Sequence, residues 1–235
     1  MTKPLRERIL LRIAIVLAVA LGVRVLVLIL NEYQFYFPPD FDASSFLTSR
    51  KDSFKGLYRA AFYLHIVIGP FAIVAGALLM FSGARKKFKT AHRWLGRVQM
   101  IVVVLCVAPS GLVMATDSFG GPLSGFGFAF LAIGTAITAI VAVNRARQRR
   151  FVQHQVWACR CFILLCSPML LRLMSGAMIT LEYDSVVTYR FIAWLSWLIP
   201  LGIFEAIRWR RINKRMKSRV ASSGVAIVDS KGIVS

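Results

Sequence analysis

Residues 126–143, FGFAFLAIGTAITAIVAV, form a continuous run without a charged side chain. A helix needs about 20 mostly apolar residues to cross roughly 30 Å of hydrocarbon, so this run predicts a membrane-spanning helix. The whole chain agrees, because 57% of its 235 residues are hydrophobic and only 17% are charged. Soluble domains are less apolar than this, which excludes an ordinary water-soluble fold.

Other apolar stretches of similar length lie on both sides of this run. Together they predict an all-α, polytopic membrane protein with six transmembrane helices, of which spans two to five form a central four-helix bundle. The first stretch follows Lys3, Arg6 and Arg8 and resembles a signal peptide. Because its apolar residues continue to Leu30, an uncleaved span is expected. The six spans are 9–30, 57–81, 95–116, 126–143, 156–181 and 188–207.

Basic residues are distributed unevenly among the predicted loops. Most of the 30 lysines and arginines lie before span one, between spans two and three, between spans four and five, and after span six. Cytoplasmic loops collect lysine and arginine. We therefore expect both termini in the cytoplasm and the protein in the inner (cytoplasmic) membrane. The same rule accounts for the net charge of +20, so the expected partner is anionic lipid headgroups rather than nucleic acid.

Little of the chain lies outside the spans. We expect a cytoplasmic N-terminus at 1–8, a membrane domain at 9–217 and a flexible cytoplasmic tail at 218–235. The loop at 31–56 is rich in aromatic residues and is expected at the outer membrane interface. The four cysteines lie inside apolar stretches, at spacings that fit neither a disulfide framework nor a zinc site.

The three histidines are the candidates for chemistry, because histidine suits proton transfer and transition-metal binding at neutral pH. His92 and His154 stand at the predicted cytoplasmic starts of spans three and five, so they are expected at nearly the same height. Each is preceded by a basic run and followed by W-x-x-R and an apolar helix. This indicates a weak parallel repeat, in which spans two and three match spans four and five.

Helical periodicity places each histidine on a face that is expected to point into the bundle. His65 aligns with small residues, so its face allows the close approach of another backbone or a flat ligand. The aligned sets are His65, Gly69, Ala72 and Gly76; His92, Gly96, Gln99, Val103 and Ser110; and His154, Cys161, Leu165 and Arg172.

One interpretation is a b-type haem between spans three and five, with the neutral imidazoles of His92 and His154 as axial ligands. Gly96, one turn beyond His92, would relieve crowding, and nearby arginines would pair with the propionates. The other interpretation is that both histidines are interfacial and contact lipid phosphates or helix ends. The candidate cofactor-binding residues are His65, His92, Gly96, Arg97, His154, Arg160 and Arg172, with His92 and His154 as metal ligands.

These segments resemble a bacterial family of predicted membrane proteins, a domain of unknown function numbered twenty-three-oh-six. The resemblance covers roughly residues 63–172. It rests on LHIVIGP at 64–70, on HRWLGR at 92–97, and on Arg149-x4-His154-x2-Trp157-x2-Arg160. In the family an arginine usually follows the second histidine, whereas this chain has Gln155. The resemblance implies a membrane topology and no established activity.

A looser similarity is to the six-helix b-type cytochromes that pass electrons from ascorbate across membranes. It implies an inner haem between the third and fifth helices, which His92 and His154 match, and an outer haem between the second and fourth. His65 would supply one outer ligand, but the repeat places Phe128 opposite it. The similarity therefore implies a single haem on the cytoplasmic side, with the redox partner or quinone left open.

Two other classes of function remain open. Arginines within the spans, such as Arg24 and Arg172, need partners in hydrocarbon, and prolines can open helices. Both features favour a small-solute or lipid transporter. A structural membrane subunit without a cofactor is the third class. The sequence contains no hydrolytic triad, phosphate-binding glycine loop or metalloprotease motif, so the only enzymatic role left open is that of a membrane redox protein.

Overall fold

The computed structural model describes residues 5–81 and 87–230, and the regular elements in this part of the chain are helices. Expectations for residues 1–4, 82–86 and 231–235 lie outside the described residues. The elements are α1 (Leu5–Asn31), η1 (Glu32–Phe35), α2 (Ser45–Thr48), α3 (Gly56–Met80), α5 (Lys89–Val102), the π-turn η2 (Val103–Val107), α6 (Ala108–Ala115), α7 (Pro122–Arg147), α8 (Phe151–Leu165), α9 (Ser167–Thr180) and α10 (Val186–Ser230).

Five helical stretches of the described chain are long and apolar enough to cross a membrane, and they coincide with predicted spans two to six. Large apolar side chains such as Phe71, Leu105 and Phe130 are exposed on them, as expected for surfaces that face lipid. The predicted first span forms α1, and its crossing of the membrane stays a prediction. The five stretches are Gly56–Met80, Lys89–Ala115, Pro122–Arg147, Phe151–Thr180 and Val186–Ser218.

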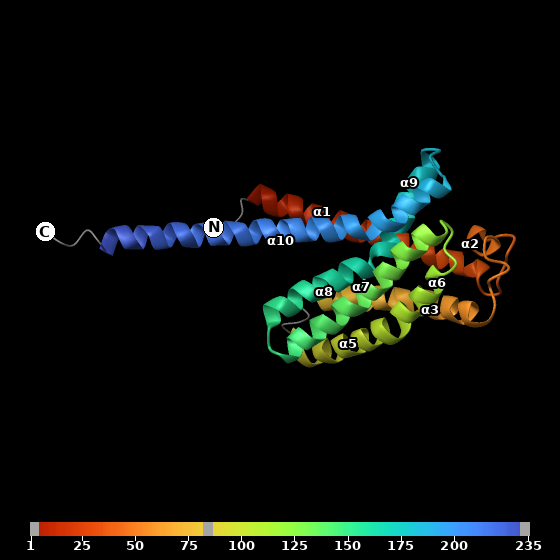
Figure 1. The fold of residues 1–235 in the computed structure, drawn as a ribbon, viewed down its shortest axis with the longest axis horizontal. Coiled ribbons are helices and arrows are strands. Elements are labelled where there is room, and N and C mark those ends of the chain that lie inside the picture. The colour runs from red at the N-terminus through yellow and green to blue at the C-terminus, as the bar shows by residue number, and fades with distance from the viewer. Residues whose placement is uncertain (1–4, 82–86, 231–235) are drawn as a thin grey trace. The chain divides into compact units, whose positions relative to one another are not determined.

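The chain divides into two compact units, Met1–Trp197 and Leu198–Ser235. In the first unit α7 packs against α6 and α8, while α3 packs against α5, α6 and α8. Figure 1 shows α3, α5, α7 and α8 running beside one another. In the second unit the helix continues to Ser230, through a stretch for which the sequence predicted a loose tail from residue 218. A helix already formed adds further turns at little cost, because only nucleation is expensive.

Two of the spans are interrupted close to a proline. The π-turn η2 precedes Pro109, and a turn at Cys166 separates α8 from α9 just before Pro168. Proline has no backbone N–H and its ring clashes with the carbonyl four residues earlier, so it disturbs the regular helix on its N-terminal side. Each interruption changes the direction in which the side chains beyond it point.

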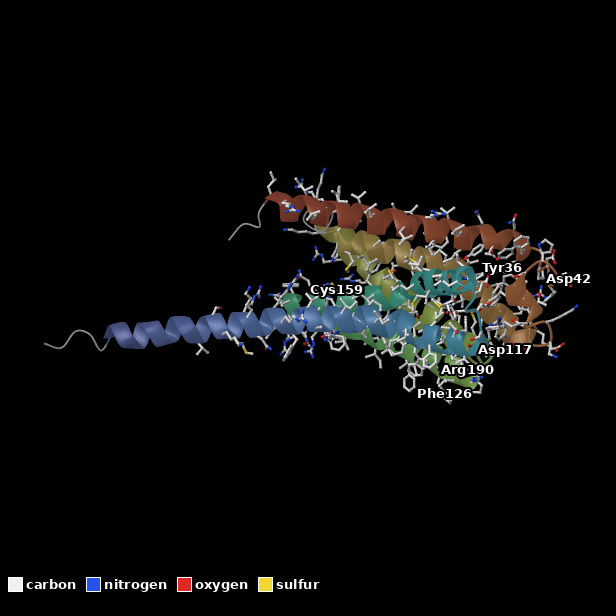
Figure 2. The ribbon with its side chains drawn as sticks, turned by 90° about the horizontal axis from the view of Figure 1, so that it is seen from above. Tyr36, Asp42, Asp117, Phe126, Cys159 and Arg190 are labelled. Carbon is white, nitrogen blue, oxygen red and sulfur yellow. The ribbon has the colours of Figure 1, made fainter. Side chains whose placement is uncertain are left out.

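The loop between α1 and α3 folds into an aromatic cluster against the start of α3. Its buried members pack edge to face around Phe62, whose side chain is fully covered. Figure 2 shows Tyr36, Asp42, Asp117 and Arg190 at the same end of the helices, with Cys159 farther along them. The buried core of the cluster consists of Tyr36, Leu47, Phe54, Tyr58 and Phe62.

Candidate functional site

His92 from α5 and His154 from α8 line one cavity, with a volume of about 310 Å³. We call it the His92–His154 cavity. Its walls come from α3, α5, α7 and α8, and they include glycine and alanine residues beside larger side chains such as Phe162 and Leu165. The two histidines that the sequence singled out are thus brought together, and Gly96 lies in the same wall. The small lining residues are Gly76, Gly96, Ala139, Ala142 and Ala158.

His154 is held in one orientation by a hydrogen bond from its Nδ1 to the carbonyl oxygen of Ala142, 2.8 Å away. A carbonyl only accepts hydrogen bonds, so Nδ1 carries a proton, and Nε2 is the ring nitrogen left for another partner. Metal-binding histidines in proteins commonly make this second contact, because it fixes both the tautomer and the direction of the ring.

Gln99 and Gly76 shape the same cavity. The buried side chain of Gln99 donates from Nε2 to the carbonyl oxygen of Ala72 at 2.8 Å, which ties α5 to α3. Gly76 lies against the ring of Phe162, and a Cβ at position 76 would come within 2.9 Å of Phe162 Cδ2. Both residues stand on the polar or small-residue faces that helical periodicity predicted.

The three arginines among the candidate cofactor-binding residues lie elsewhere. Arg97 is exposed on α5, and the guanidinium of Arg160 stacks over the ring of Trp157, with Cζ 4.2 Å from its centroid. Arg172 is exposed on α9, beyond the turn at Cys166. The structure therefore does not bring these three side chains into the wall of the His92–His154 cavity.

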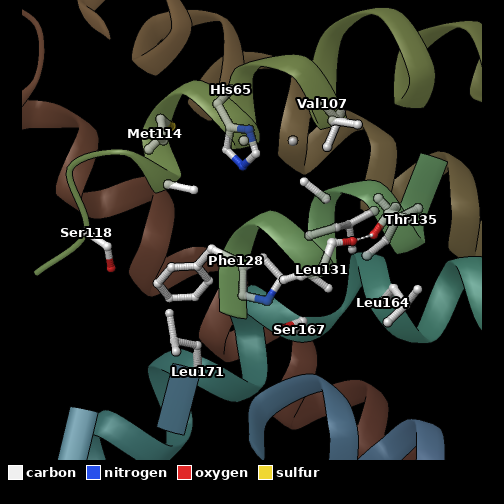
Figure 3. Close-up of a pocket in the computed structure, with 18 of the residues that line it drawn as sticks. His65, Val107, Met114, Ser118, Phe128, Leu131, Thr135, Leu164, Ser167 and Leu171 are labelled. Carbon is white, nitrogen blue, oxygen red and sulfur yellow. Dashed lines mark hydrogen bonds between the residues drawn. The ribbon is translucent and has the colours of Figure 1, made fainter. Parts of the chain in front are cut away.

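His65 lines a separate cavity of about 220 Å³, which we call the His65 cavity. His65 Nδ1 lies 2.9 Å from Ser110 Oγ, which in turn donates to the carbonyl oxygen of Cys106 at 2.6 Å. Figure 3 shows the other ring nitrogen of His65 pointing toward Phe128 and Leu131. Phe128, which the repeat aligns with His65, lines the same cavity. The contact between His65 and Ser110 was not anticipated from the sequence.

The described residues contain no group of three or more His, Cys, Asp or Glu side chains placed to hold a metal ion. A metal enclosed by protein ligands alone is therefore not indicated in this part of the chain. Two imidazoles in one cavity suit a metal that arrives with its other ligands already attached.

Comparison with known proteins gives one match. The model of a family described as predicted membrane protein, DUF2306, matches residues 62–207, a segment that contains all three histidines. No curated protein and no solved structure matches the chain.

Proposed function

This chain belongs to the DUF2306 family of predicted membrane proteins, and on that premise we propose that it is a b-type cytochrome with one haem held between His92 and His154. The observation that carries the proposal is that both imidazoles line one cavity. Six membrane crossings, a central bundle of spans two to five, an inner-membrane location and cytoplasmic termini complete the proposal. The crossings rest on the lengths of the apolar stretches, and the location and orientation rest on the distribution of lysine and arginine along the sequence.

The residues present fit such a group in three respects. A bis-histidine site needs two neutral imidazoles, and the contact with Ala142 already presents Nε2 of His154 as a ligand atom. A flat macrocycle needs room between the helices, and Gly96 leaves space on α5, where a Cβ would make only an ordinary contact with Leu79. The remaining wall is mostly apolar, which suits the porphyrin ring.

A haem with two histidine ligands supplies one-electron transfer. The protein's part is to hold both rings at a fixed separation and to exclude water from the iron. The hydrogen bond from Gln99 to Ala72 and the contact between Gly76 and Phe162 fix α5 and α8 against α3. Cationic side chains at the same end of the protein are proposed to contact anionic lipid headgroups.

The test is a spectrum of the purified protein after expression with added haem precursor. We expect a reducible b-type spectrum that is lost in His92→Ala and in His154→Ala. His65→Ala is the matched control, because it removes the third histidine from a different cavity. A folded protein that elutes as a single species and remains colourless would refute the proposal.

A further inference from the structure

The His65 cavity contains neither His92 nor His154, so it needs an explanation of its own. We propose that it binds the ring of a hydrophobic quinol. The role of this quinol as an electron donor rests on the proposed function. Its binding to the cavity can be measured independently of haem.

His65 offers this cavity a hydrogen-bond acceptor. Ser110 Oγ lies 2.6 Å from the carbonyl oxygen of Cys106, 3.1 Å from that of Val107 and 2.9 Å from His65 Nδ1. Ser110 has one hydroxyl proton, and in the arrangement that we propose it donates this proton to one of the carbonyls and accepts from His65 Nδ1. The neutral imidazole then has its lone pair on Nε2, the nitrogen that points toward Phe128 and Leu131. Such an acceptor selects a ligand that carries a hydroxyl group, as a quinol does.

The walls of the cavity favour a flat apolar ring. Phe128 faces His65 across it, and Val107, Leu131 and Leu164 supply aliphatic surface. Aromatic side chains pack well against a second ring. A sugar or another ligand with many polar groups would leave most of them without hydrogen bonds here, at a large cost in desolvation.

The same cavity holds a hydroxyl group that needs an acceptor. Tyr58 is 8% exposed and its hydroxyl lies close to Arg50, whose N–H groups can only donate, so the hydroxyl proton has no acceptor among the described residues. Tyr58 precedes His65 by seven residues of α3, or two turns, which is about 10 Å along the axis. A ring with oxygens on opposite edges spans such a distance with one hydrogen bond at each end.

Arg50 also lines this cavity, and its contacts favour a neutral ligand over an anionic amphiphile such as a fatty acid. Its guanidinium is buried and already donates from Nε to the carbonyl of Asp117 at 3.1 Å and from Nη1 to that of Phe46 at 2.9 Å. Phe46 also lies under the cation, with Cζ 4.0 Å from the ring centroid. Two backbone carbonyls and an aromatic face thus already contact the guanidinium.

The experiment uses the full-length protein in quinone-free lipid nanodiscs and an azido-substituted decylbenzoquinol as photolabel. We expect labelled peptides from α3 and α7, with labelling suppressed by unmodified decylbenzoquinol. His65→Asn keeps an amide near the position of Nδ1 and removes the acceptor at the position of Nε2. The affinity for decylbenzoquinol should therefore fall about tenfold, as expected for the loss of one hydrogen bond. His65→Gln places its amide near Nε2 and should retain most of the affinity.

The outcomes separate this site from the haem. His154→Ala should lose the haem spectrum and keep quinol binding, whereas His65→Asn should do the opposite. A colourless protein that still binds quinol through His65 would refute the haem proposal and support the quinol site. Labelling outside α3 and α7, equal affinity in wild type and His65→Asn, or displacement by oleate as effective as by decylbenzoquinol would overturn the quinol site.

Discussion

The hydroxyl of Tyr33 donates a hydrogen bond to the carbonyl oxygen of Ile66 in α3. Pro70 lies four residues beyond Ile66, and because proline has no backbone N–H, this carbonyl lacks its usual helical donor. An unpaired carbonyl is costly in hydrocarbon, where water cannot replace the missing donor. A side chain from the loop after α1 therefore completes the hydrogen bonding of a span that proline interrupts.

Tyr33→Phe should lower the free energy of unfolding by about 1–3 kcal/mol, since it leaves a buried carbonyl without a donor. The loss should be smaller in a Pro70→Ala background, where the backbone N–H of residue 70 can bond to Ile66. Thermal unfolding of the four proteins in detergent gives this double-mutant cycle. Equal losses in both backgrounds would show that the hydroxyl does not serve this carbonyl.

Ionisation of the same hydroxyl should make the stability of the folded protein decrease at alkaline pH. Burial raises the pKa of Tyr33 from 10.0 to about 12. A raised pKa means that the folded state favours the neutral phenol, so this stabilisation is complete below pH 10 and is lost as the pH rises to about 12. The melting temperature of Tyr33→Phe should fall less over this interval than that of wild type. The exposed Tyr183 provides the control, because Tyr183→Phe should follow wild type.

Gly76→Ala should destabilise the protein by about 1–3 kcal/mol, because the added methyl group meets the ring of Phe162 at 2.9 Å. Gly69→Ala on the same helix is the matched control. A Cβ there has no neighbour within 4 Å, so the better helix propensity of alanine should leave stability unchanged or raise it by up to about 1 kcal/mol. The melting temperatures of the two variants would test this, and a reversed order would contradict the packing described for α3 and α8.

Gly96→Leu should abolish haem binding without unfolding the protein. A Cβ at position 96 has only an ordinary contact, with Leu79 at 3.9 Å, so the larger side chain can extend into the His92–His154 cavity. The ratio of haem absorbance to protein measures the loss, and size-exclusion chromatography reports the fold. Gly176→Leu on α9, where a Cβ meets nothing within 4 Å, should keep the full haem content. Undiminished haem in Gly96→Leu would place the cofactor elsewhere.

The sequence predicted the spans well because a crossing helix depends on the composition of one continuous segment. Spans two to six recur as five long apolar helices. The approach of His92 and His154 was predictable for a related reason, since both stand just inside the basic ends of their spans. The repeat aligned Phe128 with His65 and so indicated that span four offers no second histidine, but it did not predict that the two residues line one cavity.

Helical periodicity was less successful at predicting which side chains share a face when it was applied along a whole span. Cys161 and Leu165 share a wall with His154, but Arg172 lies beyond the turn at Cys166 and is exposed. A phase of 100° per residue cannot be carried through such a break. The contact between His65 and Ser110 was hidden for a similar reason, because Ser110 follows the π-turn η2 and its partner lies 45 residues away.

Leu165 lines both the His92–His154 cavity and the His65 cavity. This side chain therefore lies where the two chambers share a wall. A smaller residue at this position should widen both chambers, and a larger one should take volume from both. The size of residue 165 thus affects how fully each compartment can be filled.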